Sequence, residues 1–181
     1  MKLFVSLITA LSVLFSFSAF SKTILVSTKG PGSGNPFWAA VEQGAKDAAA
    51  ELGVDLVILS PPQESDVMAQ VNQLEDQIAK GVDGIAVAPT DPSAVAPILD
   101  EAIAAGIPVV YIDTNGINEG VTFIGTNNIN GAKLAADYIC GKVPKGSDVA
   151  ILQGMITQTT GQHRAEGSHK GLTECGLNIV A

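Results

Sequence analysis

The stretch that decides the fold spans residues 23–60 and reads TILVSTKGPGSGNPFWAAVEQGAKDAAAELGVDLVILS. It opens with a short apolar run at 23–28 and closes with a second at 54–60, and a helical pattern from about Pro36 to Leu52 lies between them. Both runs are nearly continuous in apolar residues, which is typical of strands covered on both faces. The stretch therefore predicts a strand–helix–strand unit with parallel strands.

The same alternation continues along the chain. Further strand-like runs lie at 84–90, 108–113 and 121–126. The helical pattern before residue 84 has one apolar face, and we expect Asp91 to cap the next helix, which ends at Gly106. The apolar face consists of Val67, Val71, Leu74 and Ile78. This order predicts an α/β fold with a doubly wound parallel sheet and right-handed crossovers.

The pattern then begins again. A helix is expected from about Asn128, a strand at 148–154, a helix from about Gly161 and the start of another strand at LNIVA, 177–181. One complete strand cannot bury both faces of a sheet, so the pattern favours a two-domain protein of which this chain is a part. We expect an N-terminal lobe at 22–126 and an incomplete, similar C-terminal lobe at 127–181.

The N-terminus has the features of a signal peptide, with a cut expected after Ser21. Lys2 gives a positive start, residues 3–17 form an apolar core, and Ala19-Phe20-Ser21 fits the small-x-small cleavage pattern. A membrane anchor is the alternative, but the apolar stretch is short for a span and no charged flank follows it. The sequence therefore predicts an exported, soluble mature chain.

The charge balance bears on the partner. The chain has 18 acidic and 10 basic residues, so its formal net charge is −8. Proteins that bind nucleic acid carry basic patches, and this acidic balance argues against such a partner.

The chain has two cysteines, Cys140 and Cys175, and each stands near the end of an expected helix. An oxidising compartment permits a disulfide between them if the two helices are neighbours that point the same way. Two buried free thiols are the alternative, because spacing alone does not fix the geometry that a disulfide needs.

The glycine-rich loop after the first strand raises the question of a nucleotide site. The dinucleotide fingerprint G-x-G-x-x-G needs a third glycine where this loop has Asn35, and the acid expected after the second strand is absent. No G-x-x-x-x-G-K-[ST] motif occurs either. The loop therefore favours another kind of ligand, and no cofactor is expected.

Polar and aromatic side chains gather at the carboxyl ends of the expected strands, where open α/β sheets bind ligands. Asn35 donates and accepts hydrogen bonds, an aromatic face suits the C–H face of a sugar ring, and a carboxylate and an Arg fork each bridge adjacent hydroxyls. Trp38, Asp113 and Arg164 complete that set. The alternatives are core packing for Phe37 and Trp38, a turn or cap role for Asp113, and a solvent-exposed helix position for Arg164.

Metal binding and catalysis have little support. His163 and His169 do not share a helix face, and no H-x-x-x-H spacing occurs. There is no G-x-S-x-G elbow for a nucleophile. Asp91 and Asp113 follow adjacent strands, but Asp91 is better explained as a cap. We predict no metal site and no enzymatic activity, and an exported α/β enzyme is the disfavoured alternative.

Five stretches of the chain carry a family resemblance when they are taken together. They are NPFWAAVEQGAKDAAAELG, QIAKGVDGIAVAPTD, AGIPVVYIDT, GTNNINGAKLAADYI and ILQG…QHRAEG. The chain resembles the N-terminal part of a type I periplasmic substrate-binding protein, and is most similar to the ribose-binding group that serves ABC sugar importers. This resemblance covers residues 22–181. It implies two α/β lobes joined by a hinge near Gly125–Asn127, with a ligand held in the cleft between them.

The resemblance also implies roles for single residues. Asn35 matches the family's cleft Asn, and Phe37 and Trp38 match its two aromatics, one of which stacks on the sugar. Asp113 matches the acid at the end of the fourth strand. Two further matches come from the second lobe, namely Arg164, which reaches into the cleft, and Asn128, which lies in the crossover motif and has a weaker claim to contact the ligand.

The function that the resemblance implies is that of a periplasmic, monomeric solute-binding protein, which captures a pentose or hexose and delivers it to the permease of an ABC importer. Two departures argue against ribose itself: Thr114 stands where ribose binders have Arg, and the first loop is longer and contains Lys29. Lys29 and the SPPQES segment resemble relatives that bind autoinducer-2 or rhamnose, so Lys29 is either a ligand contact or a solvent-exposed loop residue. The alternative function is a sensory binding protein that signals to a chemoreceptor or sensor kinase.

Overall fold

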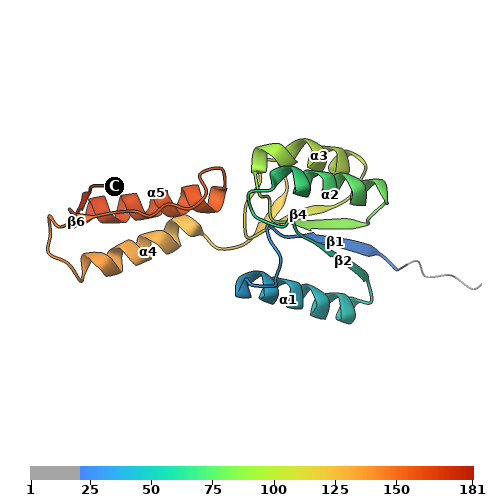
Figure 1. The fold of residues 1–181 in the computed structure, drawn as a ribbon, viewed down its shortest axis with the longest axis horizontal. Helices are drawn as coiled ribbons and strands as arrows, with labels where there is room; N and C mark the ends of the chain where they lie inside the picture. The colour runs from blue at the N-terminus through green and yellow to red at the C-terminus, as the bar shows by residue number, and fades with distance from the viewer. Residues whose placement is uncertain (1–20) are drawn as a thin grey trace, which may run out of the picture.

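A computed structural model of the protein describes residues 21–181. The predicted signal peptide, residues 1–21, lies outside the described residues except for Ser21. Within the described part of the chain, no helix is both long and apolar enough to cross a membrane. Figure 1 shows two parts joined by a single connection, residues 125–127, which we call the first lobe (β1 to β5) and the second lobe (α4 to β7).

The first lobe is built on a parallel sheet of five strands in the order β2-β1-β3-β4-β5, which confirms the predicted α/β class. The order reverses between β1 and β3, and ligands of such sheets bind beyond the carboxyl ends of the strands at this point. The strands are β1 Thr23–Ser27, β2 Asp55–Leu59, β3 Gly84–Val87, β4 Val109–Ile112 and β5 Thr122–Ile124.

Helices cover both faces of this sheet. In Figure 1, α1 (Pro36–Leu52) lies on one side, and α2 (Val67–Ala79) and α3 (Pro92–Ala104) lie on the other. The bounds of α1 agree with the prediction, and Asp91 caps α3 as expected, because its carboxylate accepts from two backbone N–H groups of the first turn. The core beneath α2 and α3 includes Leu25, Leu74, Val87, Val95, Leu99 and Tyr111.

Gln70, on α2, is a core residue that the sequence analysis missed. Its side chain is fully buried, and its amide nitrogen Nε2 donates to Ser27 Oγ, Thr28 O and Ala88 O. Its oxygen Oε1 accepts from the backbone N–H and the hydroxyl of Thr90. One side chain therefore joins the segments that follow β1 and β3, the two strands at the switch point.

The second lobe packs two helices side by side, α4 (Asn128–Cys140) and α5 (Thr159–Glu174). The contact depends on small residues. A Cβ atom added at Gly167 would lie 2.2 Å from the backbone oxygen of Ile129, and one at Gly171 would lie 2.6 Å from the Cβ of Ala136. Close approach of the two helices therefore requires glycine at both positions.

The two strands of the second lobe are shorter than predicted. β6 covers Asp148–Val149 and β7 covers Asn178–Ile179, whereas the sequence predicted a strand over 148–154. β6 and β7 pair only with each other among the described residues. One further backbone bond, from Ile151 N–H to Ala181 O at 2.8 Å, continues this pairing, and residues 152–154 have no such partner among the described residues.

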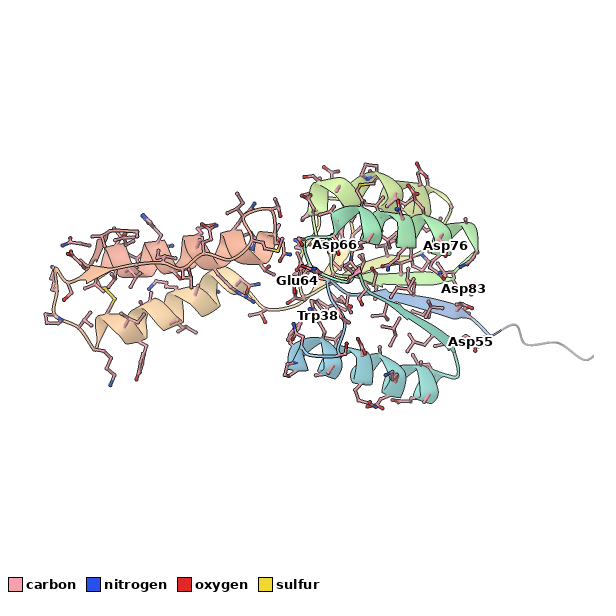
Figure 2. All side chains as sticks on the ribbon, in the orientation of Figure 1. Trp38, Asp55, Glu64, Asp66, Asp76 and Asp83 are labelled. Atoms are coloured by element: carbon pink, nitrogen blue, oxygen red, sulfur yellow. A yellow bond between two sulfur atoms is a disulfide. The ribbon has the colours of Figure 1, made fainter. Side chains whose placement is uncertain are left out.

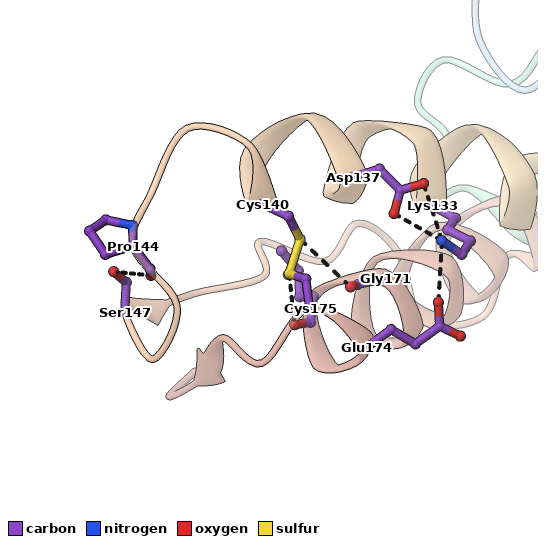
Figure 3. Close-up of a disulfide and its surroundings, with 9 residues drawn as sticks. Lys133, Asp137, Cys140, Pro144, Ser147, Gly171, Glu174 and Cys175 are labelled. Atoms are coloured by element: carbon purple, nitrogen blue, oxygen red, sulfur yellow. Dashed lines mark hydrogen bonds and ion pairs between the residues drawn. A yellow bond between two sulfur atoms is a disulfide. The ribbon is translucent and has the colours of Figure 1, made fainter.

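A disulfide joins Cys140 and Cys175, as predicted, with 6.1 Å between the Cα atoms. Figure 3 shows that it links the C-terminal ends of α4 and α5. Lys133, two turns before Cys140 on α4, contacts Asp137 of the same helix and Glu174 of α5. The hydrogen bonds that Lys133 donates to the carboxylates of Asp137 and Glu174 raise its pKa. The disulfide and these ion pairs therefore hold α4 and α5 together at the end of the second lobe that lies away from the first lobe.

Candidate ligand site between the two lobes

The loop after β1 brings the first group of predicted residues to the edge of the sheet. Its backbone is held at Gly32, whose N–H donates to Glu42 Oε1 at 2.7 Å. It ends at Asn35, whose Oδ1 accepts from Phe37 N at 3.0 Å and so caps α1. Asn35 therefore combines a capping role with a place on the wall of the site.

The two adjacent aromatics have different surroundings. Phe37 is 52% exposed, whereas Trp38 is only 2% exposed. Their rings meet edge to face with centroids 4.8 Å apart. The indole N–H of Trp38 donates to Glu64 Oε1 at 3.3 Å, and Lys29 Nζ lies 5.8 Å from the centre of its ring. Phe37 is thus the aromatic whose ring is exposed, whereas the ring of Trp38 is buried and lies beneath Lys29 of the loop.

Asp113 follows β4 in a left-handed backbone conformation, with φ of 57°. Aspartate is one of the few residues apart from glycine that adopt this conformation readily. Its backbone N–H donates to Ile124 O at 3.0 Å, and its Oδ2 accepts from the hydroxyl of Thr114 at 2.9 Å and lies 3.2 Å from Lys29 Nζ. The backbone turn directs this carboxylate away from the sheet toward the second lobe's residues in the hollow described below.

The second lobe supplies residues from the start of α5. Arg164, in the second turn, donates from Nε to Asn128 Oδ1 at 2.7 Å. Gln158 precedes the helix and is 4% exposed, yet its side chain does not cap α5. Its Oε1 accepts from Lys29 Nζ at 2.9 Å, and its Nε2 donates to Glu64 Oε2 at 3.3 Å.

These side chains surround one hollow of about 460 Å³ between the lobes. Figure 2 shows Trp38 and Glu64 at the end of the first lobe that faces the second lobe, with Asp55 and Asp83 at the opposite end. Six of the seven predicted ligand residues line the hollow, namely Lys29, Asn35, Phe37, Trp38, Asp113 and Arg164.

The seventh predicted residue, Asn128, lies elsewhere. It lines a neighbouring hollow of about 330 Å³, which shares Asp113 and Thr160 with the first. Its contact with the site is indirect, because its side-chain oxygen holds Arg164. Its direct contact with a ligand stays a prediction.

Three polar residues of the hollow were missed, Glu64, Gln158 and Thr160. Glu64 lies in the SPPQES segment after β2, which is a strand end of the kind that carries ligand residues. Gln158 had no such signal, since it stands in an irregular segment before α5. Glu64 and Asp113 bring two negative charges and Lys29 and Arg164 two positive ones, so the formal charges of the hollow balance.

A family model described as periplasmic binding protein domain matches residues 27–181. The chain belongs to this family. Among the residues that the structure describes, no group of three or more His, Cys, Asp or Glu side chains is arranged to hold a metal ion. The polar side chains that line the hollow of this periplasmic-binding-protein domain are the hydrogen-bonding groups described above.

The chain is similar to three proteins of known name or structure, each of which it covers only in part. A D-ribose/D-allose-binding protein of Pseudomonas aeruginosa is 33% identical over 156 residues, which is 81% of this chain and 49% of that protein. The crystal structure of an ABC transporter solute-binding protein from Burkholderia multivorans has a TM-score of 0.82 at 30% identity, over 90% of this chain and 60% of that one. Another, from Burkholderia graminis in complex with D-arabinose, has a TM-score of 0.81 at 30% identity, over 88% and 54%. The chain spans about half the length of the curated relatives it matches.

Proposed function

We propose that the protein is a solute-binding protein that captures a monosaccharide, a pentose or a hexose, in the hollow between its lobes. The observation that carries this proposal is that Asp113 and Arg164, from different lobes, line the same hollow as Asn35 and Phe37. Such a set surrounds a small polyhydroxy ring with hydrogen-bonding groups on two sides and an aromatic face on a third.

Each group has a defined task in this proposal. The Asp113 carboxylate accepts hydrogen bonds from ring hydroxyls, and the Arg164 guanidinium donates to hydroxyl or ring oxygens through the N–H groups other than its Nε–H, which Asn128 engages. The Asn35 side chain caps α1 through its oxygen, and its amide nitrogen bonds no other residue in the described part of the chain, so it donates to the sugar. The exposed ring of Phe37 provides the apolar platform. Three further residues hold these groups in place: Lys29 pairs with Asp113, Trp38 packs against Phe37, and Asn128 bonds Arg164.

The relatives support a sugar as the ligand. Their names and bound molecules include ribose, allose and D-arabinose. The hollow of about 460 Å³ lies within the usual range for small-ligand sites, roughly 300–1,000 Å³. Closure of two lobes around the ring provides affinity without any chemical step, so the proposal includes no catalysis.

The remaining parts of the proposal concern location and partners. The predicted signal peptide at 1–21 directs the protein to the periplasm, where an oxidising environment maintains the Cys140–Cys175 disulfide. The loaded protein, acting as a monomer, delivers its sugar to the membrane permease of an ABC importer. Residues 125–127, which link the lobes, serve as the hinge.

One observation favours a second candidate. Lys29 is buried in the wall of the hollow and is not a solvent-exposed loop residue. An ammonium group at this place fits the alternative of a sensory binding protein for autoinducer-2 or rhamnose-like ligands, which would signal to a chemoreceptor.

A thermal-shift panel of pentoses, hexoses, polyols and autoinducer-2 on the full-length protein tests the proposal. A large shift with one sugar is expected. A shift with autoinducer-2 or rhamnose alone would favour the sensory role, and no shift with any compound would contradict sugar capture.

A further inference from the structure

Gln158, from the second lobe, bonds two loops of the first lobe across the hollow. It accepts a hydrogen bond from Lys29 Nζ, in the loop after β1, at 2.9 Å. It donates to Glu64 Oε2, in the loop after β2, at 3.3 Å. One amide therefore reaches two loops of the first lobe, and it uses its acceptor for a cation and its donor for a carboxylate.

The two partners of Gln158 are themselves held in place. Glu64 accepts from the indole N–H of Trp38 through its other oxygen, at 3.3 Å. Lys29 lies 3.2 Å from Asp113 Oδ2. The first lobe thus presents a fixed carboxylate and a fixed ammonium, and Gln158 matches both.

The burial of Lys29 and Gln158 increases the contribution of their hydrogen bond to the free energy of closure. Lys29 and Gln158 are each 4% exposed. Buried polar groups are costly unless they are hydrogen-bonded, and a hydrogen bond to a charged group contributes more than a neutral one. When the lobes move apart, Gln158 exchanges both partners for water. The contacts therefore stabilise the closed arrangement by themselves.

We propose that Gln158, Lys29 and Glu64 form an interlobe lock, in which Gln158 is the positioning residue that holds the lobes closed. The lock adds to closure whatever the ligand contributes, and it keeps Lys29 turned toward Asp113. The part of this proposal that concerns ligand release rests on the proposed function, whereas the part that concerns closure does not. The bond from Thr159 Oγ1 to Asn115 O at 3.0 Å also crosses between the lobes and limits how far loss of the lock opens them.

A closed population that the protein itself stabilises raises apparent affinity, because ligand binding no longer bears the full cost of closure. Loss of the lock is therefore expected to increase the dissociation rate of a bound sugar about tenfold, on the scale of one charge-assisted hydrogen bond.

Small-angle X-ray scattering on the ligand-free, full-length protein measures closure directly. Gln158→Ala removes both hydrogen bonds of the lock. The exchange variant Glu64→Gln with Gln158→Glu retains a donor opposite an acceptor and places a carboxylate against Lys29, so it restores the lock. Gln162→Ala is the matched control, since Gln162 lies in the first turn of α5, close to Gln158, and its side-chain amide donates to Ile156 O of the same lobe. Circular dichroism establishes that each variant is folded.

The radius of gyration is expected to increase in Gln158→Ala and to return to the wild-type value in the exchange variant. Equal radii in wild type and Gln158→Ala, or an exchange variant as expanded as Gln158→Ala, would overturn the lock. Dissociation rates of D-ribose, D-allose or D-arabinose separate the two proposals. A larger radius in a protein that binds none of these sugars leaves the lock standing and counts against sugar capture, whereas sugar binding with equal radii does the reverse.

Discussion

Lys29 and Asp113 form an ion pair across the site, with Nζ 3.2 Å from Oδ2 and side-chain exposures of 6% and 18%. The pair joins the loops after β1 and β4, which are separated in the sheet by β3. Removing one partner of a buried pair is costly because the other charge is left alone. The pair therefore fixes the position of the carboxylate that we assign to the sugar.

Asp113→Asn is expected to retain the fold and to weaken sugar binding at least tenfold. Asparagine tolerates the left-handed backbone at this position, but it lacks the negative charge that accepts two hydroxyl hydrogens and pairs with Lys29. Asp113→Ala should abolish binding and cost more stability than the about 1–2 kcal/mol that alanine loses in this backbone conformation, because it also leaves the buried Lys29 ammonium without its carboxylate. Isothermal titration and chemical denaturation check the two effects. Unchanged sugar affinity in Asp113→Asn would exclude Asp113 from the site.

Phe37 and Trp38 are expected to respond differently to truncation. Phe37→Ala should weaken sugar binding by about 1 kcal/mol with little loss of stability, since the ring is half exposed. Trp38→Ala should lower the free energy of unfolding by about 3–5 kcal/mol, because the ring is buried and its removal leaves a cavity. Denaturant titrations and sugar affinities measured on both variants distinguish these outcomes. A strongly destabilised Phe37→Ala would contradict the assignment of Phe37 to the cleft.

Gln70→Leu is expected to lower the free energy of unfolding by about 2–4 kcal/mol, because it leaves buried donors and acceptors after β1 and β3 without partners. Gln43→Ala is the matched control, since the Gln43 side chain is bonded only to Asp47 on the surface of α1. Equal denaturation midpoints for Gln70→Leu and the control would show that the buried network contributes nothing.

Loss of the disulfide is expected to destabilise the second lobe. The bond closes a loop with a sequence separation of 35 residues, and a loop of this size corresponds to about 3–4 kcal/mol in the chain-entropy account. The double variant Cys140→Ala with Cys175→Ala should therefore unfold the second lobe at lower denaturant concentration, and hydrogen exchange should report the change in α4 and α5. Wild type treated with a reductant should behave in the same way, and no difference in either case would contradict this role.

The elements of the fold were largely predictable because their signals are local. Asn35 and Pro36 mark the start of α1 and Gly53 its end, so the helix bounds agree with the sequence pattern. The strands of the first lobe are continuous apolar runs, and such runs need no knowledge of their neighbours. β6 was predicted too long because the length of a strand depends on the strands beside it.

The site was predictable where a strand end delivers a residue and not where two lobes meet. Asp113 and Lys29 follow strands directly, and both line the hollow. Gln158 looked like a loop residue, since its partners are 129 and 94 positions away in the chain. Gln70 lies three residues after Val67 and four before Leu74, so its position falls on the predicted apolar face of α2, but only the packing of α2 over the switch point shows which backbone groups its buried amide bonds.

The central claim is that residues of both lobes hold one sugar in the hollow, and isothermal titration of wild type beside Arg164→Ala tests it most directly. The sugar with the largest thermal shift is the titrant. We predict one site per chain in wild type and at least tenfold weaker binding in Arg164→Ala, because the second lobe then lacks its hydrogen-bond fork. Equal affinity in the two proteins, or no heat of binding in wild type, would contradict the account.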